Sequence, residues 1–211
     1  MTRTAPLLFL LFLITATAAE AEWKKIDEQD GIQAFSEEVP GSKTVAFRGV
    51  ATLDAPASKI LWVLLDNDHS TEWVDRLKTV KVLKAVSPTD FVVYQEYKLS
   101  WPAANRDYVM EKKAVRDPKT KQISVVMKSV EHADAPKTTG VRAELKRSAY
   151  ILTPLDNGKT QVEAEIHSDA KGSLPSMVVN SVQKGWPVKT LKGLAEQVKK
   201  PYVQEFDLQK L

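Results

Sequence analysis

The sequence predicts an α+β domain in which an antiparallel sheet is followed by one long C-terminal helix. Strand-length runs succeed one another between residues 79 and 169, separated by clusters of Pro, Asp, Asn, Gly or Lys, as in sequential hairpins. Apolar and polar residues alternate in the later runs, which is typical of a sheet with one buried and one solvated face. After Pro175, apolar residues recur at helical spacing as far as Val198. The runs are 79–86, 91–99, 108–115, 123–130, 141–152 and 161–169.

Residues 1–21 predict a secretory signal peptide that is not part of the domain. Arg3 gives a positive start, residues 7–14 form an unbroken apolar run, and residues 15–21 contain two A-x-A matches. Because roughly 20 apolar residues are needed to span a bilayer, this run is too short for a membrane anchor. We therefore expect cleavage after Ala18 or Ala21 and one folded domain over residues 22–211.

The composition favours an exported bacterial protein that does not bind nucleic acid. The chain has no cysteine, whereas secreted eukaryotic domains often carry disulfides, so a periplasmic location is expected, with secretion as the alternative. The 30 Lys and Arg residues against 27 Asp and Glu give a net charge of +3, too small to indicate a nucleic-acid partner. A surface on which nucleic-acid bases stack requires aromatic residues placed among Lys and Arg residues, and this sequence does not have that pattern.

The first part of the domain predicts a helical turn and two strands. Residues 23–26 fit one amphipathic helical turn. Asp30-Gly31 is a turn signal that separates this segment from residues 32–39. That run fits a strand ending at Pro40-Gly41, which is a strong turn signal. Residues 44–53 alternate apolar and polar side chains and predict a second strand.

Two short helices are expected next. Pro56 lies near the first turn of one helix, where a missing backbone N–H is tolerated. The second is expected to open at His69 or Ser70 and to carry Trp73 and Leu77 on one side. The apolar stripe of the first helix consists of Ile60, Leu61, Leu64 and Leu65.

Alternation assigns the faces of the last two strands. In residues 141–152 it places Ala149 and Ile151 on the apolar face and Ser148 and Tyr150 on the polar face. In residues 161–169 the apolar face holds Val162, Ala164 and Ile166.

The C-terminal helix is expected to bend. Gly185-Trp186-Pro187 interrupts its apolar periodicity, and a proline inside a helix costs about 3 kcal/mol if the lost hydrogen bond is not replaced. A helix that bends over an open sheet would form a usable lid, and a helix that only covers the core fits the same pattern.

No motif for catalysis, a metal or a cofactor is present. The fragment His167-Ser168-Asp169 could belong to a metal pair or a nucleophilic triad, but alternation places His167 on the charged face with Glu163 and Glu165. The further ligand that zinc requires is not visible in the sequence. G-x-S-x-G, Gly-rich phosphate loops and CxxC do not occur. We therefore expect neither metal nor cofactor, and no enzymatic activity.

Three motifs resemble the steroidogenic-acute-regulatory-related lipid transfer (START) family. They are residues 101–109 (WPAANRDYV) with the pair Arg106-Asp107, Gly140-Val141-Arg142, and residues 169–180 (DAKGSLPSMVVN). Their order and spacing agree with the family from residue 22 to about residue 200. The resemblance implies a helix-grip fold, in which a curved sheet wraps a C-terminal helix and encloses one lipid in an apolar cavity.

The resemblance also implies a function in binding and carrying a hydrophobic ligand, with transient contact with a membrane surface. Two alternatives stay open. Members of the wider superfamily use the cavity for polyketide cyclisation, which needs acid and base groups within it. Here these would be Glu96, Tyr94, Tyr97 and Tyr108. The other alternative is an interaction module whose cavity is collapsed.

Glu96 and Lys112 are the charged candidates for the cavity. If residues 91–99 pair with residues 108–115, these two side chains could lie opposite each other, and a surface ion pair worth well under 1 kcal/mol is one interpretation. The other is that Glu96 faces the cavity. By resemblance, Glu96 takes the acidic and Lys112 the basic position of sterol-binding members. A lysine where an arginine is expected weakens bidentate pairing and argues against a sterol ligand.

The remaining candidates lie near strand ends, loops and the helix. The resemblance matches Arg106 and Arg142 to family positions, which we interpret first as clasps between strand ends and second as ligand groups. Met177 lies at the start of the helix. Core packing, or contact with the cavity rim, is expected for Trp73, Trp101 and Trp186.

Access to the cavity is expected to depend on the C-terminal helix and the loop 131–139. The loop lacks apolar periodicity and carries Pro136, so its local opening should be easy. The lysines of the helix would rest on anionic lipid head groups during contact.

Overall fold

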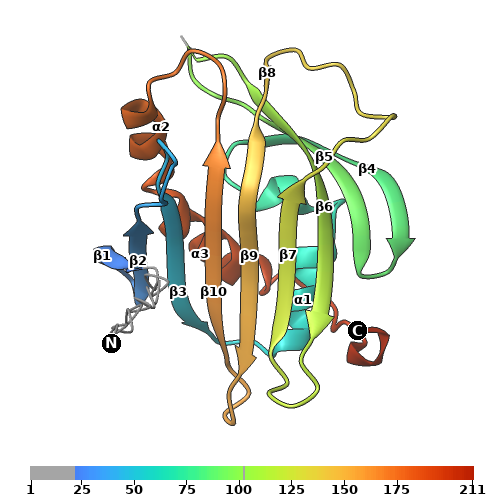
Figure 1. Ribbon diagram of the computed structural model, residues 1–211. Coiled ribbons are helices and arrows are strands. Elements are labelled where there is room, and N and C mark those ends of the chain that lie inside the picture. The colour runs from blue at the N-terminus through green and yellow to red at the C-terminus, as the bar shows by residue number, and fades with distance from the viewer. Residues whose placement is uncertain (1–21, 102) are drawn as a thin grey trace, which may run out of the picture.

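The computed structural model describes residues 22–101 and 103–211 (Figure 1). Within them, ten strands form one sheet in the order β1-β2-β3-β10-β9-β7-β6-β5-β4, with β8 paired to β6. The α+β fold expected from the sequence is confirmed. The expected signal peptide, residues 1–21, lies outside the described residues. The strands are β1 (Lys24–Gln29), β2 (Ile32–Glu37), β3 (Ala46–Leu53), β4 (Leu77–Ser87), β5 (Asp90–Tyr97), β6 (Arg106–Arg116), β7 (Ile123–Ser129), β8 (Val141–Arg142), β9 (Glu144–Pro154) and β10 (Thr160–Asp169).

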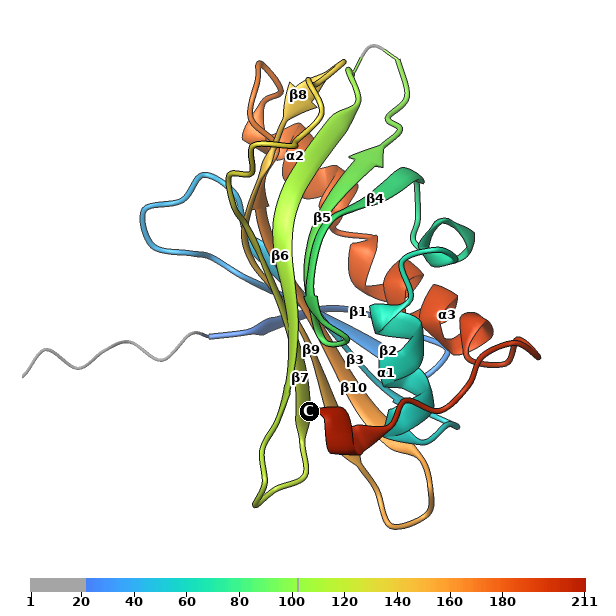
Figure 2. The ribbon, with the colours of Figure 1, turned by 90° about the vertical axis from the view of Figure 1, so that its right-hand side faces the viewer.

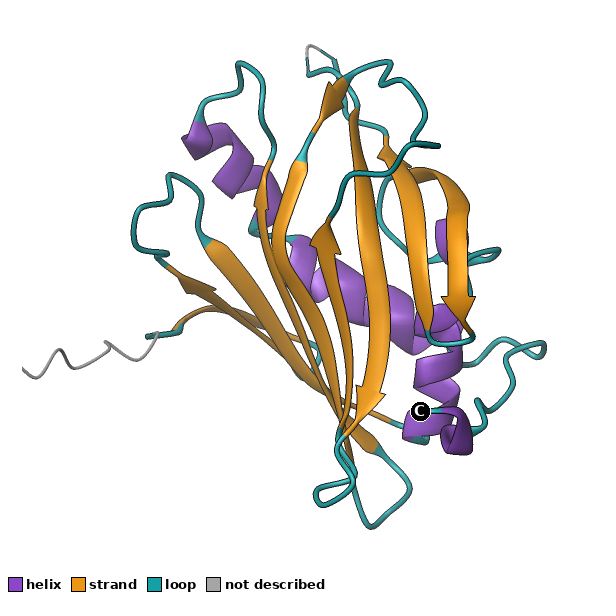
Figure 3. Ribbon diagram, turned by 45° about the vertical axis from the view of Figure 1, so that its right-hand side comes forward, coloured by secondary structure: helices purple, strands orange, loops and turns teal. Residues whose placement is uncertain are grey.

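The helices lie on one face of this sheet. Figure 2 shows α1 and α3 side by side on the concave face, while the opposite face carries no helix in this view. Figure 3 shows β4, β5 and β6 curling toward the helices. This is the arrangement of a sheet that grips a C-terminal helix. The helices are α1 (Ala57–Leu65), α2 (Ser176–Gln183) and α3 (Trp186–Gln197), with the 3₁₀ helices η1 (Ser70–Glu72) and η2 (Leu208–Lys210).

The helical turn expected at residues 23–26 is wrong, because residues 24–26 open strand β1. β1 pairs with β2 across Asp30-Gly31, and both turn residues have positive φ, 52° and 77°. An Asp-Gly pair in this conformation is the preferred two-residue hairpin turn. Four residues are too few to distinguish the period of a helix from that of a strand. The Asp30-Gly31 hairpin turn is therefore the stronger indication of structure in this part of the sequence.

The first expected helix is confirmed as α1. Its expected stripe is buried, with Ile60 and Leu61 fully enclosed in the core. The second expected helix is only the short η1, which Trp73 follows directly. Residues 69–77 are therefore mostly an irregular segment at the end of the sheet.

Helix α3 lies close against β3 because Gly49 has no side chain. A Cβ atom built at Gly49 would lie 2.8 Å from Cδ1 of Leu191 and 3.0 Å from Cβ of Pro187. Leu191 and Leu194 are fully buried at this contact. The close approach fixes α3 in the core and leaves α2 beyond it at the end of the sheet.

The break at Gly185-Trp186-Pro187 is confirmed, but it is not a strained kink. The chain forms two helices, and Pro187 lies in the first turn of α3 with Gly185 at the N-cap. In the first turn a backbone N–H has no partner within the helix, so proline loses no hydrogen bond there. The cost expected for a proline in a helix interior is therefore avoided.

The face assigned to the second half of β9 is wrong. Leu145 pairs with Ser168 and Arg147 pairs with His167, so Lys146 is an extra residue in β9. Such a bulge turns the rest of the strand over. Ser148 and Tyr150, expected on the polar face, are consequently buried.

Candidate functional site: an apolar cavity between sheet and helices

A cavity of about 580 Å³ lies between the concave face of the sheet and the helices. Its size is within the range of pockets that hold a whole small molecule. Strands β5, β6, β7, β9 and β10 supply the wall, while α1, α2 and the start of α3 close it. Most of the wall is apolar, including Leu64, Met110, Val125, Met127, Leu145 and Ile166.

The cavity opens at one end. Its exposed lining residues come from four segments: Asp75 and Arg76 after η1, Ser100 in the loop between β5 and β6, Val178 and Val182 on α2, and Lys189 on α3. Exposed lining residues mark the place where a cavity meets solvent, and we call this place the mouth. The loop 131–139, expected to gate the cavity, contributes no lining residue.

Half of the ten candidate site residues line the cavity, and the rest lie elsewhere. Those that line it are Tyr97, Arg106, Tyr108, Lys112 and Trp186. Those outside the lining are Tyr94, Glu96, Trp101, Arg142 and Met177. Lining residues that sequence reasoning did not select as binding groups include Gln95, Ser148, Tyr150, Ser168 and Gln183.

Glu96 lies on the outer face of the sheet and is not opposite Lys112. Its partner across the sheet is Asp107, whereas Lys112 is opposite Phe91. Successive residues of a strand point to opposite faces, so the cavity positions of Gln95 and Tyr97 direct Glu96 outward. The expected Glu96–Lys112 pair is therefore wrong.

The Glu96 carboxylate has its own partners on that outer face. Lys78 Nζ donates to both oxygens, at 3.1 and 3.2 Å, and Asn105 Nδ2 donates to Oε1 at 3.0 Å. These hydrogen bonds hold the pKa of Glu96 below its usual value. Glu96 therefore ties β5 to the loop that precedes β6.

Tyr94 and Arg142 belong to a clasp centred on the buried Asp107. Tyr94 Oη donates to Asp107 Oδ2 at 3.4 Å, and Arg142 Nε donates to Asp107 Oδ1. Arg142 Nη2 also donates to the carbonyl of Pro136 at 2.7 Å. The clasp ties the loop 131–139 to the sheet outside the cavity lining, which supports the first interpretation of Arg142.

Arg106 is both a clasp and a lining residue. Its Nε donates to the carbonyl of Ala170 at 3.0 Å, Nη2 to that of Lys171 at 3.3 Å, and Nη1 to that of Ala104. Only 4% of Arg106 is exposed. The guanidinium therefore joins the loop before β6 to the loop after β10, beside the mouth.

Trp101 and Met177 flank the mouth without lining the cavity. Trp101 is 92% exposed in the loop that contains the lining residues Ser100 and Ala103. Met177 is 80% exposed on α2, next to the lining residue Val178. Both candidates consequently belong to the outer surface around the opening.

Lys112 is buried in the wall of the cavity beneath α1. Its Nζ donates to the carbonyl of Leu64 at 3.0 Å and to Asn67 Oδ1 at 2.7 Å, and it lies 5.9 Å from the ring centre of Phe91. Burial lowers the pKa of Lys112 to about 8, and the charge of Asp66 partly opposes this. The ammonium is thus held by neutral acceptors.

The other polar groups of the wall are largely satisfied by the protein. Tyr97 Oη donates to Gln95 Oε1 at 2.8 Å, and Gln183 Nε2 donates to Ser168 Oγ at 2.6 Å. Burial raises the pKa of Tyr97, Tyr108 and Tyr150, so these phenols stay protonated. The carboxylate among the described lining residues, Asp75, lies at the mouth and pairs with Lys189 at 3.0 Å. A converging acid and base pair is thus not formed within the described wall.

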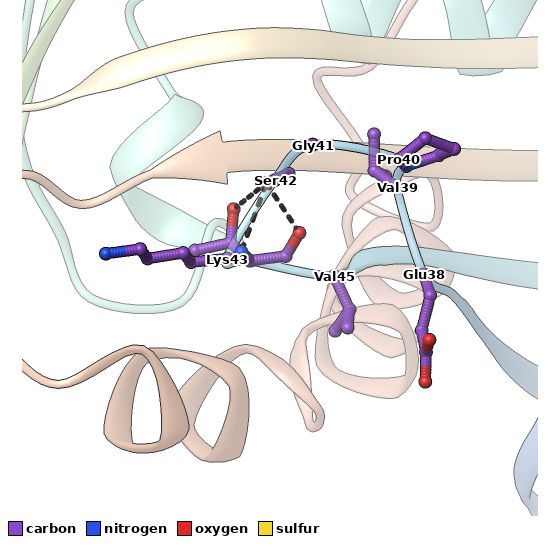
Figure 4. Close-up of a pocket in the computed structure, with 8 residues that line it drawn as sticks. Glu38, Val39, Pro40, Gly41, Ser42, Lys43 and Val45 are labelled. Atoms are coloured by element: carbon purple, nitrogen blue, oxygen red, sulfur yellow. Dashed lines mark hydrogen bonds between the residues drawn. The ribbon is translucent and has the colours of Figure 1, made fainter.

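A second hollow of about 460 Å³ lies in the loop between β2 and β3. Figure 4 shows that its lining comes from that loop alone, with Glu38 and Lys43 extending away from each other. Ser42 and Thr44 in this loop hold His167 Nε2, at 3.1 and 3.2 Å. The hollow therefore has no set of converging groups, and His167 supports the loop.

Neither a metal cluster nor a membrane-spanning helix is found in the part of the chain that the structure describes. Residues 22–101 and 103–211 contain no group of three or more His, Cys, Asp or Glu side chains placed to hold a metal ion. Their helices are also too short or too polar to cross a bilayer.

The chain is similar to proteins of known family over most of its length. The model of the START domain matches residues 10–201. An uncharacterized protein of Pseudomonas aeruginosa is 28% identical over 192 residues, which are 90% of this chain and 93% of that protein. The ceramide transfer protein of Xenopus laevis is 22% identical over 214 residues, or 93% of this chain, which spans only 33% of that longer protein.

Solved structures share the fold. A STAR-related lipid transfer protein fragment from Xanthomonas axonopodis superimposes with a TM-score of 0.75 at 27% identity, covering 84% of this chain and 99% of that one. The Zhui aromatase/cyclase of Streptomyces shows the fold alone, with a TM-score of 0.52 at 16% identity over 73% of this chain and 93% of that one. Together with the cavity under a gripped C-terminal helix, the match over residues 10–201 shows that the chain belongs to the START domain family.

Proposed function

We propose that the protein binds one hydrophobic molecule in its cavity and carries it through an aqueous compartment without changing it chemically. The observation that carries this proposal is the cavity of about 580 Å³, with its apolar wall and its mouth. Each methylene exposed to water costs about 0.8 kcal/mol, so a sixteen-carbon chain faces roughly 13 kcal/mol outside a membrane. A dry apolar cavity offsets most of that cost.

The ligand class is a lipid or another hydrophobic small molecule. The START domain family binds such ligands, and the similar Xanthomonas protein is named as a lipid transfer protein. The open cavity argues against the alternative of an interaction module with a collapsed interior. Carriage is also consistent with a periplasmic location, which remains an expectation from the N-terminal sequence.

Uptake and release take place at the mouth, between α2 and the loop that joins β5 to β6. Both segments place residues in the cavity lining and in solvent, whereas the loop 131–139 contributes no residue to the lining. The α2–α3 break at Gly185 allows α2 to move while α3 stays packed on β3. The gate is therefore assigned to α2 and to residues 98–101 and 103–105 of this loop.

Transient contact with a membrane would use the same end of the molecule. Trp101, Met177, Val178 and Val182 are large apolar side chains exposed around the mouth. Tryptophan is enriched where proteins meet the membrane–water interface. Lys98 and Lys184 are exposed nearby in sequence, and each lysine close to an anionic surface adds about 1 kcal/mol of attraction.

An enzyme of the cyclase type is the alternative. In its favour, the cavity holds three tyrosines and a lysine whose pKa is lowered to about 8 by burial. Against it, Glu96 and Tyr94, two of the groups expected to supply acid and base, are outside the lining. Ligand carriage therefore explains more of the residues that line the cavity than a cyclase activity does.

Native mass spectrometry of protein purified without detergent tests this proposal. One hydrophobic molecule per chain, identical in mass before and after incubation with the protein, is the expected result. Protein that never retains a lipid would contradict carriage. A bound molecule whose mass changes on incubation would favour the cyclase alternative.

A further inference from the structure

Two cations, Arg106 and Lys112, are buried in the wall of the cavity, and they differ in their position and in the hydrogen bonds that they make. Arg106 gives its donors to three backbone carbonyls, at Ala104, Ala170 and Lys171. These bonds use three of its five N–H donors and hold the guanidinium in the clasp beside the mouth. Lys112 lies farther in, beneath α1, and is 4% exposed.

Lys112 keeps one donor for a ligand. An ammonium has three N–H donors, and the hydrogen bonds among the described residues use two of them, to Leu64 and Asn67. Both acceptors are neutral. The third donor therefore remains for a group inside the cavity that Lys112 lines.

No carboxylate among the described residues pairs with Lys112. The charged group that acts on it is Asp66 at the end of α1, and that carboxylate is engaged by His69 Nδ1 at 2.6 Å. From β5, Lys112 faces the ring of Phe91, and Glu96 lies on the other face of the sheet. A buried charge without a counter-charge is unfavourable until a partner arrives.

We propose that the cavity selects an amphiphile with a single anionic head, a carboxylate or a phosphate, which binds Lys112 while the apolar tail extends toward α2. This inference rests on the proposed function and names its ligand class. A charge-assisted hydrogen bond to the third donor supplies the missing counter-charge. Apolar wall residues such as Met110, Met127 and Leu145 enclose the tail.

Other head groups fit this wall less well. A neutral head leaves Lys112 without a counter-charge, and a cationic head adds a like charge beside it. The head must also be small, because the tail shares the same cavity of about 580 Å³.

Three probes with the same sixteen-carbon chain test the inference: palmitate, hexadecyl phosphate and hexadecanol. We expect the wild-type protein at pH 7 to bind at least one anionic probe about tenfold more tightly than hexadecanol. Lys112→Met should remove that preference and leave hexadecanol binding within about twofold. Methionine fills nearly the same volume without a charge, so the variant should fold, and its unfolding temperature checks this.

Lys113→Met is the matched control. Lys113 is the next residue of β6, and its side chain is exposed outside the cavity lining. Its Nζ lies 3.5 Å from Oδ2 of Asp90. Its loss should leave the anionic preference unchanged. The preference of the wild-type protein should also weaken as pH rises above about 8, because Lys112 then loses its proton. The Lys112→Met variant should show no such dependence.

The outcomes separate this inference from the proposed function. If wild-type protein binds hexadecanol as tightly as both anionic probes, the inference is overturned and carriage stands. If Lys112→Met keeps the preference, the head binds elsewhere and the inference is overturned. If none of the three probes binds, the inference is overturned, and native mass spectrometry of the purified protein decides separately whether carriage of another hydrophobic ligand stands. A preference for palmitate or for hexadecyl phosphate supports it and identifies the head as carboxylate or phosphate.

Discussion

Glu96 and Lys112 lie on opposite faces of the sheet, although they belong to neighbouring strands. Lys112 lines the cavity, and Glu96 binds Lys78 and Asn105 outside it. This relationship separates the two charges that a buried ion pair would have joined. Among the described residues it leaves Lys112 in the cavity wall without a carboxylate partner and joins Glu96 to Lys78 and Asn105.

Glu96→Ala should lower stability by about 1 kcal/mol at pH 7, because it removes a part-exposed ion pair and one amide hydrogen bond. The folded-state pKa of Glu96 is lowered, so this contribution is present above the usual glutamate pKa of about 4.3. It is lost as pH falls through the folded pKa. Urea unfolding at pH 7 and at pH 3 measures both values. A loss of 3 kcal/mol or more, or any loss of ligand affinity, would place Glu96 in the cavity.

Arg106→Gln should lower stability by roughly 2–4 kcal/mol, because it takes a donor from up to three backbone carbonyls around the mouth. Amide hydrogen exchange should accelerate in residues 98–105 and 170–175. Arg76→Gln, at an exposed side chain of the same mouth, should change stability by less than about 0.5 kcal/mol. Equal effects of the two changes would rule out the clasp.

Gly49→Ala should destabilise the protein by about 1–3 kcal/mol, since the new methyl group would meet Leu191 and Pro187 of α3. Gly185→Ala is the matched control, because the nearest atom to its Cβ would be 4.0 Å away. Thermal unfolding of both variants decides the point. A neutral Gly49→Ala would mean that α3 is not held closely on β3.

Linking Ser100→Cys to Val182→Cys with a reducible bismaleimide should stop lipid exchange between vesicles, because both positions line the mouth. The sequence has no cysteine, so the two new thiols are the sole targets. Reduction of the linker should restore exchange. Labelling the same two thiols with a monofunctional maleimide controls for bulk alone. Full exchange in the linked protein would mean that the gate lies away from α2 and this loop.

Trp101→Ser with Met177→Ser should weaken binding to anionic vesicles about tenfold and leave stability within 0.5 kcal/mol, because both side chains are exposed. Added salt should weaken the remaining binding by screening the lysines. Sedimentation with vesicles measures the change. Unaltered binding would place the membrane contact elsewhere on the molecule.

Local patterns predicted much of this fold. Strands β5, β6, β7 and β10, helix α1 and the break before α3 all follow from apolar periodicity and from Pro and Gly positions. Local patterns could not predict on which face of the sheet the Glu96 side chain lies. The assumed partner, Lys112, lies five residues after the observed partner, Asp107, and a shift by an odd number exchanges the faces. That register depends on the loop 98–105, in which Asn105 binds Glu96.

The bulge at Lys146 is the second feature that could not be predicted from the sequence. It places Ser148 and Tyr150 in the cavity against their apparent alternation. The shift in register occurs opposite His167 and Ser168 of β10, and Ser42 and Thr44 bind His167 from more than a hundred residues away. A contact so distant in sequence leaves no trace in the local pattern. The residues of β9 that line the cavity could therefore be identified only from the three-dimensional structure.

Quenching of tryptophan fluorescence by a dibrominated stearate tests the central claim most directly. Trp73 and Trp186 line the cavity, whereas Trp101 is 92% exposed and lies outside the lining. Carriage in this cavity predicts saturable quenching at one ligand per chain, most of which disappears in the Trp73→Phe, Trp186→Phe double variant. The Trp101→Phe control should keep it. Quenching that is absent, or that survives the double variant, would contradict a ligand bound between the sheet and the helices.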